Sequence, residues 1–261
     1  MLKKLLFLAM FLVFSLSLIS NEIVQPQGIT DWIFPGKSLT YKNNVATFYE
    51  TMLISRGFIA INPNKKYIVE GEFKSSSKGK DAKFQLGVVS LNAQRRIITP
   101  VNTIVVPGSG ATLLKAAPKG SKTISVKTIY TWNPKSKSYI VAKADNSGKF
   151  TDLPNYNVIG KIANIVAKDK KTLEVTLEKP LTNDLPLGEN IRLHSPGAVH
   201  VCSKAVTTNK EWKKFSHIIT GYSKGHTQTN FRHGAKYAKI FLYNHRGAAI
   251  EFKNITLKEL K

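Results

Sequence analysis

Residues 235–260 read AKYAKIFLYNHRGAAIEFKNITLKEL, and this stretch decides the fold. Apolar and polar positions alternate along its first half, which is typical of a β-strand with one face in a core. One face carries Ala238, Ile240 and Leu242, and the other carries Lys239, Phe241 and Tyr243. The Asn-His-Arg-Gly sequence at 244–247 then supplies a turn signal. We therefore predict a closing β-hairpin.

The second half of this stretch changes phase. Ile250 and Phe252 share one face, whereas Ile255 and Leu257 lie one position out of phase. This shift predicts a β-bulge near residues 253–254. A two-stranded hairpin is marginally stable in water, so the rest of the chain must supply sheets for it to pair with.

Further strand-like runs precede it at 58–61, 67–74, 84–91 and 97–106. In the run 67–74, Tyr67, Val69, Gly71 and Phe73 share one face, which we predict to be the core face. The chain has no heptad pattern and no amphipathic stretch longer than two helical turns. These patterns predict an all-β fold of the sandwich class.

The character of the sequence changes after Pro-Gly-Ser-Gly at 107–110. Residues 113–196 form short strand-like runs between tight turns, with a hairpin tip at 168–171. About 84 residues can form a small barrel or sandwich with its own core. We predict a signal peptide at 1–20, a β-sandwich formed by 21–112 and 197–261, and a smaller β module inserted at 113–196.

Residues 1–20 have the pattern of a secretory signal peptide. Lys3 and Lys4 precede an apolar run at 5–19, and cleavage after Ser17 or Ser20 would release the mature chain. The alternative is a membrane anchor, because the run approaches the length of a spanning helix. The signal-peptide reading predicts a secreted, periplasmic or cell-surface protein with no membrane span in its mature form. Cys202 is the only cysteine, so such a protein has no intrachain disulfide.

The chain is strongly basic. Its 261 residues include 39 Lys and Arg against 16 Asp and Glu, a formal charge of +23, or +21 without Lys3 and Lys4. A surface of this kind attracts polyanions. Export favours an acidic polysaccharide, anionic lipid or cell-wall polymer over nucleic acid. The alternative is that dispersed lysines keep a β-rich protein soluble and protect its sheet edges.

Three segments resemble galactose-binding-like jelly-roll domains. They are YIVEGEFKS at 67–75, EWKKFS at 211–216, and AKIFL with IEFKNITL within 238–257. The resemblance covers about residues 29–110 and 197–260, and it implies a jelly-roll sandwich interrupted by an insertion. Many such domains are carbohydrate-binding modules, so the resemblance implies a polysaccharide partner. Lys253-Asn254 stands where that family often has paired aspartates near a structural calcium ion, and we predict no cofactor.

Catalytic patterns are weak. Glu70 and Glu72 project from one strand face about 7 Å apart, a spacing that fits an inverting glycosidase pair, but a solvated strand face explains them as well. His200 and Cys202 likewise share a strand face, which is compatible with a metal ligand pair or a cysteine nucleophile. A buried thiol beside an edge histidine is the alternative. We predict no catalytic residue, no metal and no enzyme activity.

The binding residues come from the opening segment and the loop at 221–237. Sugar rings stack their C–H faces on aromatic side chains, and their hydroxyls need polar partners. The residues of these types that we predict to bind ligand are Trp32, Tyr222, His226, Asn230, Arg232 and His233. The sequence therefore predicts a non-catalytic carbohydrate-binding protein. The alternatives are a structural or adhesive cell-surface sandwich without a sugar site, and a subunit of a glycan-degrading enzyme.

Overall fold

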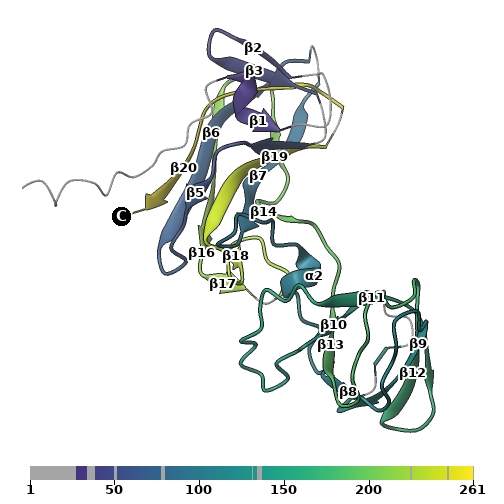
Figure 1. Ribbon diagram of the computed structural model, residues 1–261. Helices are drawn as coiled ribbons and strands as arrows, with labels where there is room; N and C mark the ends of the chain where they lie inside the picture. Colours follow the sequence, from purple (N-terminus) through teal and green to yellow (C-terminus); the bar gives the residue numbers. More distant parts are fainter. Residues whose placement is uncertain are drawn as a thin grey trace, which may run out of the picture.

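The computed structural model describes residues 28–33, 39–49, 52–77, 80–130, 132–133, 137–223, 225–245 and 247–260. Within these residues nearly all of the regular secondary structure is β-strand, which confirms the predicted all-β class. Figure 1 shows a β-sandwich in the upper lobe and a β-barrel in the lower lobe. The predicted signal peptide at 1–20 lies outside the described residues.

The first layer of the sandwich is a seven-stranded sheet. Its main path runs in the order β1, β4, β19, β7 and β14, while β15 pairs with β7 and β5 pairs with β19. All of these pairings are antiparallel. The strands are β1 (Trp32–Ile33), β4 (Met52–Ser55), β5 (Ile59–Ala60), β7 (Ala82–Leu91), β14 (His200–Cys202), β15 (Val206–Thr208) and β19 (Tyr237–Asn244).

The second layer is a five-stranded antiparallel sheet in the order β16, β6, β20, β3 and β2. Its strands are β2 (Thr40–Lys42), β3 (Val45–Phe48), β6 (Lys66–Ser75), β16 (Lys213–Thr220) and β20 (Ile250–Leu260). β17 (Tyr222–Ser223) and β18 (Phe231–Arg232) form a short parallel pair beside the sandwich. β20 changes register against β6 between Lys253 and Thr256, which confirms the predicted bulge.

One core fills the space between the two sheets. Tyr67, Val69 and Phe73 on β6 are buried, as their alternation predicts, and they meet side chains from β7 and β19. Aromatic rings dominate the packing: Phe73 stacks on Phe84 with 4.4 Å between centroids. Ring pairs of this kind stabilise a core by about 0.5–1.5 kcal/mol beyond the area that they bury.

The prediction of a closing hairpin at residues 235–260 is wrong. β19 pairs with β4, β5 and β7 in the seven-stranded sheet, whereas β20 pairs with β3 and β6 in the five-stranded sheet. The turn between them therefore crosses from one layer to the other. Both strands bury their apolar faces in the same core, so the alternation is equally compatible with pairing and with crossing.

The lower lobe is a closed six-stranded barrel with the order β10, β11, β12, β9, β8 and β13. Its strands are β8 (Ala111–Leu113), β9 (Thr123–Thr128), β10 (Tyr139–Ala142), β11 (Val158–Ala167), β12 (Thr172–Leu177) and β13 (Asn190–His194). β11 and β12 form the hairpin predicted around 168–171. The barrel has its own apolar cluster, which includes Val126, Ile140 and Leu177.

The prediction of a strand at 97–106 is wrong: this segment has only isolated β-bridges at Ile97 and Val105, with a helical turn, α2 (Pro100–Thr103), between them. Pro100 suits the first position of a helix, and Thr99 and Asn102 cap the turn reciprocally. The other helical segment of the described chain is η1 (Ile29–Asp31), a 3-10 turn. No helix in this part of the chain is long and apolar enough to cross a membrane.

A buried polar network lies where the barrel meets the α2 segment. Arg192 on β13 donates from Nη2 to Asp152 Oδ2 (2.6 Å), from Nε to His194 Nε2 (2.9 Å) and from Nη1 to the Asp145 carbonyl (2.9 Å). His194 Nδ1 lies 2.6 Å from the Val101 carbonyl. Burial lowers the pKa of His194 to about 4, so its ring is neutral near pH 7. The network satisfies a guanidinium whose side chain is 1% exposed.

Whether the barrel segment is a separate folding unit stays a prediction. The chain enters and leaves it at adjacent points, because the Ser195 N–H donates to the Ile104 carbonyl (2.8 Å). Replacing residues 105–194 with a short Gly-Ser linker should therefore leave a folded sandwich, since domain insertions occur where both ends lie together. Circular dichroism should show β-sheet structure that melts cooperatively. A remainder without a melting transition would show that the two lobes need each other to fold.

Candidate functional site

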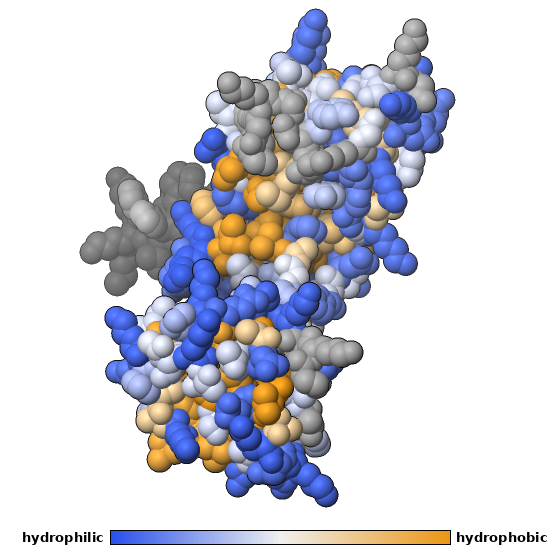
Figure 2. Space-filling model, turned by 90° about the vertical axis from the view of Figure 1, so that its right-hand side faces the viewer, coloured by the Kyte–Doolittle hydropathy of each residue, from blue (hydrophilic) through white to orange (hydrophobic). Residues whose placement is uncertain are grey.

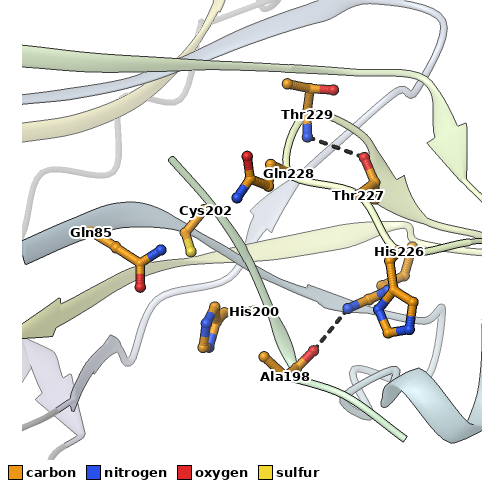
Figure 3. Close-up of a pocket in the computed structure, with 9 residues that line it drawn as sticks. Gln85, Ala198, His200, Cys202, His226, Thr227, Gln228 and Thr229 are labelled. Carbon is orange, nitrogen blue, oxygen red and sulfur yellow. Dashed lines mark hydrogen bonds between the residues drawn. The ribbon is translucent and has the colours of Figure 1, made fainter. Parts of the chain in front are cut away.

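A pocket of about 580 Å³ opens beside β14, at the edge of the seven-stranded sheet. Figure 3 shows strand residues along one side of it and the loop between β17 and β18 on the other. Nearly every lining side chain offers a hydrogen-bonding atom, so the pocket suits a polar ligand. The lining consists of Gln85, Ala198, His200, Cys202, His226, Thr227, Gln228, Thr229 and Arg232.

A glycine on β7 sets the position of β14. Cys202 lies opposite Gly87 in the register of the two strands. A Cβ atom at Gly87 would lie 2.1 Å from the Val201 carbonyl oxygen, far inside van der Waals contact. Only glycine therefore lets β14 approach this closely, and the place of His200 in the pocket depends on that approach.

His200 connects the pocket to the outer face of the sheet. Its ring stacks on Phe241 with 4.1 Å between centroids and 15° between planes. Burial, helped by the charge of Arg232, lowers the pKa of His200 to about 4. The imidazole is therefore neutral near pH 7, with one nitrogen that donates a hydrogen bond and one that accepts.

Cys202 lies beside His200 and is buried. Burial raises the pKa of its thiol to about 11, so the thiol is protonated at neutral pH. A cysteine nucleophile acts as the thiolate, and this environment opposes that role. Among the described residues, no three or more His, Cys, Asp and Glu side chains gather as a potential metal site.

Arg232 on β18 is the one arginine among the described residues that lines the pocket. The residue is only 2% exposed. Its Nη2 donates to the Ala198 carbonyl (2.8 Å), the hydrogen bond that ends at Ala198 in Figure 3. Its Nε and Nη1 are buried and have no hydrogen-bond partner among the described residues. The guanidinium is therefore desolvated and only partly satisfied.

The other predicted residues of the 221–237 loop have different surroundings. His226 is exposed and lines the pocket next to Arg232. Tyr222 and His233 contact each other, with 5.3 Å between ring centroids, but neither lines this pocket. His233 Nδ1 lies 3.3 Å from the Leu153 carbonyl of the barrel lobe. The fold thus brings His226 and Arg232 together and directs His233 toward the barrel.

Asn230 holds the loop in shape. Its Nδ2 donates to the Thr220 carbonyl (2.6 Å), and its Oδ1 accepts from the Thr227 hydroxyl (2.7 Å). Both ends of the amide are therefore used within the protein. Asn230 supports the loop that carries Thr227 into the pocket lining.

Trp32 is located in the sandwich core. It is 0% exposed, and its ring meets Phe252 edge-on with 5.4 Å between centroids. A ligand cannot stack on a ring whose faces are covered, so this position does not provide the rim residue that the sequence predicts. The opening segment instead places Trp32 on β1, where it pairs with Ser55 of β4.

The outer side of β19 carries aromatic and basic side chains, which we name the aromatic face. Its rings at Phe58, Tyr237 and Tyr243 are half-buried, whereas Phe241 and Lys239 are buried beneath their neighbours. Lys239 Nζ lies 4.2 Å from the Phe58 ring centroid, and the Arg95 guanidinium lies 5.0 Å from the same ring. In Figure 2 apolar side chains, in orange, form a patch on the upper lobe bordered by hydrophilic side chains. The aromatic face consists of Phe58, Arg95, Tyr237, Lys239, Phe241 and Tyr243.

Sequence reasoning missed the aromatic face, although the signal is present. The alternation of β19 places Tyr237, Phe241 and Tyr243 on the side opposite Ala238, Ile240 and Leu242. An outward side that is itself aromatic indicates a contact surface more than ordinary solvation. Phe58 and Arg95 have no comparable signal, because they join the face from distant segments.

The two glutamates of β6 lie on the opposite sheet. Glu70 pairs with Lys258 (2.7 Å) and Lys214 (3.0 Å), and the hydrogen bond from Lys258 holds its pKa below the ordinary value. Asn254 donates to Glu72 (2.7 Å) and lowers its pKa as well. An inverting glycosidase needs one carboxyl group with a raised pKa as its acid. Both carboxylates are held ionised, so this pair lacks that property.

Comparisons with known proteins assign no family. No protein-family model matches the chain, and no curated protein matches it. A solved structure described as "CBM4 structure and function" aligns with 86% of this chain and 76% of that chain, at a TM-score of 0.34 and 7% identity. A similarity this low identifies neither a common fold nor a shared ligand.

Proposed function

We propose that this protein is a secreted, non-catalytic carbohydrate-binding protein that binds a polysaccharide on the seven-stranded sheet. The observation that carries the proposal is the aromatic face, joined to the polar pocket through His200. Sugar rings need aromatic surfaces for their C–H faces and hydrogen-bonding groups for their hydroxyls. This surface offers both over one continuous region. Secretion rests on the pattern of residues 1–20 alone.

The geometry supports binding more than catalysis. Glu70 and Glu72 are neutralised by lysines and lie on the other sheet. Cys202 is protonated at neutral pH because its thiol is buried. The part of the pocket lining that the structure describes holds no carboxylate that could act as a glycosidase acid or nucleophile. A binding role needs only the groups that the surface already presents.

Tyr243→Ala should weaken polysaccharide binding roughly 2- to 10-fold, because stacking on one ring contributes about 0.5–1.5 kcal/mol. Tyr243 is half-buried on the aromatic face, and its ring lies 6.3 Å from that of His200. Affinity electrophoresis in gels that contain neutral or acidic polysaccharides would measure the change. The matched control is Tyr49→Ala, because Tyr49 follows β3 of the other sheet and is 52% exposed.

Two results would count against the proposal. If the unmodified protein is retarded by no polysaccharide at low salt, the structural or adhesive alternative is favoured. If Tyr243→Ala and Tyr49→Ala weaken retardation equally, the bound surface is not the aromatic face. Retardation that depends on salt alone would assign the behaviour to the formal charge of +23.

A further inference from the structure

The two fully buried arginines of the described residues are satisfied very differently. Arg192 directs all three of its guanidinium nitrogens to partners, including the carboxylate of Asp152. Arg232 has the Ala198 carbonyl alone, while its Nε and Nη1 remain unpartnered. No carboxylate of the described residues forms an ion pair with Arg232. Arg232 is therefore a buried cation without a counter-charge.

Burying an unpaired charge is costly, because water is removed and nothing replaces it. A guanidinium in this position keeps its charge at neutral pH and presents a planar set of donors. Such donors match the two oxygens of a carboxylate or sulfate group. Arg232 therefore has two donor nitrogens, Nε and Nη1, that lack a hydrogen-bond partner among the described residues and that an oxyanion can satisfy.

The rest of the pocket agrees with an anion. None of the described residues that line it is acidic, so none of them repels a negative group. His226 lines the same space, and its imidazole can donate a hydrogen bond to an oxyanion. His200, which is neutral near pH 7, also lines the pocket and stacks on Phe241 of the aromatic face. His200 therefore lies between the half-buried Tyr243 of that face and the pocket that Arg232 lines.

We propose that Arg232 binds a single oxyanion, the carboxylate of a uronic acid or a sulfate ester, on the glycan that occupies the aromatic face. This inference rests on the proposed function and defines its substrate class as an acidic polysaccharide. Recognition is local: one buried arginine selects for the acidic group, in addition to the diffuse attraction of the basic surface.

The test is isothermal titration at physiological salt with three oligosaccharides: one neutral, one containing uronic acid and one sulfated. At least one acidic oligosaccharide should bind about tenfold or more tightly than the neutral one, because hydrogen bonds to charged groups are among the strongest. Arg232→Met should remove that difference, so that the acidic and neutral oligosaccharides bind it with about the same affinity. The carboxylated and sulfated compounds distinguish the two sources of the anion.

Lys204→Met is the matched control. Lys204 is exposed, lies two residues after β14 and does not line the pocket. Its substitution therefore removes one positive charge from the same region without changing the pocket. It should change acidic affinity by less than about twofold, because exposed charges are screened at this ionic strength. Equal losses in the two variants would overturn the proposal in favour of general attraction.

Arg232→Met should melt at the same temperature as the unmodified protein or higher, because it removes an unpaired buried charge. If the variant does not fold, a competition experiment with inorganic sulfate on the unmodified protein tests the oxyanion site. Inorganic sulfate should displace the acidic oligosaccharide and leave the neutral one bound. Displacement of both, or of neither, would overturn the proposal.

The failures of the two proposals can be told apart. If all three oligosaccharides bind equally and Arg232→Met has no effect, the oxyanion site is wrong and carbohydrate binding stands. If inorganic sulfate binds in an Arg232-dependent way but no oligosaccharide binds, the oxyanion site stands and the proposed function is wrong.

Discussion

Trp32→Ala is expected to lower the free energy of unfolding by about 3–5 kcal/mol, the usual cost of truncating a large core aromatic. Trp32 is 0% exposed and belongs to the core cluster between the two sheets. Its ring packs edge-on against Phe252 of β20 while its backbone pairs with Ser55 of β4. The substitution would therefore leave a cavity between strands of opposite layers. Guanidinium denaturation, monitored by far-UV circular dichroism and not by tryptophan fluorescence, would measure the loss of stability.

Trp32→Phe is the control for this prediction. It keeps most of the apolar volume and removes an indole N–H that has no hydrogen-bond partner among the described residues. We expect it to cost much less than Trp32→Ala. At temperatures where Trp32→Ala is folded, its polysaccharide affinity should equal that of the unmodified protein. If a Trp32 variant with unchanged stability loses polysaccharide binding, Trp32 contacts the ligand, as the sequence predicts.

Asp152→Ala is expected to destabilise the protein by about 3–5 kcal/mol, because it leaves the buried Arg192 without its counter-charge. Asp152 Oδ2 accepts hydrogen bonds from Arg192 Nη2 (2.6 Å) and from Asn155 Nδ2 (2.8 Å). Both groups would lose a partner at the junction with the α2 segment. Thermal and chemical unfolding, each monitored by one probe in the sandwich and one in the barrel, should both show the lower stability.

Glu174→Ala provides the comparison for Asp152→Ala. Glu174 pairs with Lys168 at 3.1 Å, but the two side chains are 44% and 53% exposed. Pairs of this kind contribute about 0–1 kcal/mol. The double substitution Asp152→Leu with Arg192→Met should recover much of the loss, because it buries no unpaired charge. Equal effects of the two single substitutions would contradict the role given to the buried network.

Much of the architecture can be predicted from the amino-acid sequence. Alternation located β6, β7, β11, β12, β19 and β20, and it identified Tyr67, Val69 and Phe73 as core residues. The phase change near residues 253–254 located the bulge in β20. These predictions succeed because side chains on a strand alternate between two faces, and burial of one face leaves a period of two in the sequence.

The candidate site was only partly readable. Residue type and loop position pointed to His226 and Arg232, which do line one pocket. They pointed equally to Trp32, which fills the core, and to His233, which faces the barrel. Residue type alone does not tell whether an aromatic or histidine side chain lies in a core, in a loop contact or on a binding surface. Its neighbours, which come from distant segments, determine which of these it is.

The amino-acid pattern alone was enough for the β class, the strands and their buried sides, because each depends on neighbours in sequence. Strand partners depended on the folded chain: β19 and β20 share a core, yet they belong to different sheets. The aromatic face and the unpaired guanidinium of Arg232 arose in the same way. They join residues as far apart as Phe58 and Lys239, or Ala198 and Arg232. Such contacts form only when packing brings remote segments together. The alternation of apolar and polar residues within one strand therefore cannot predict them.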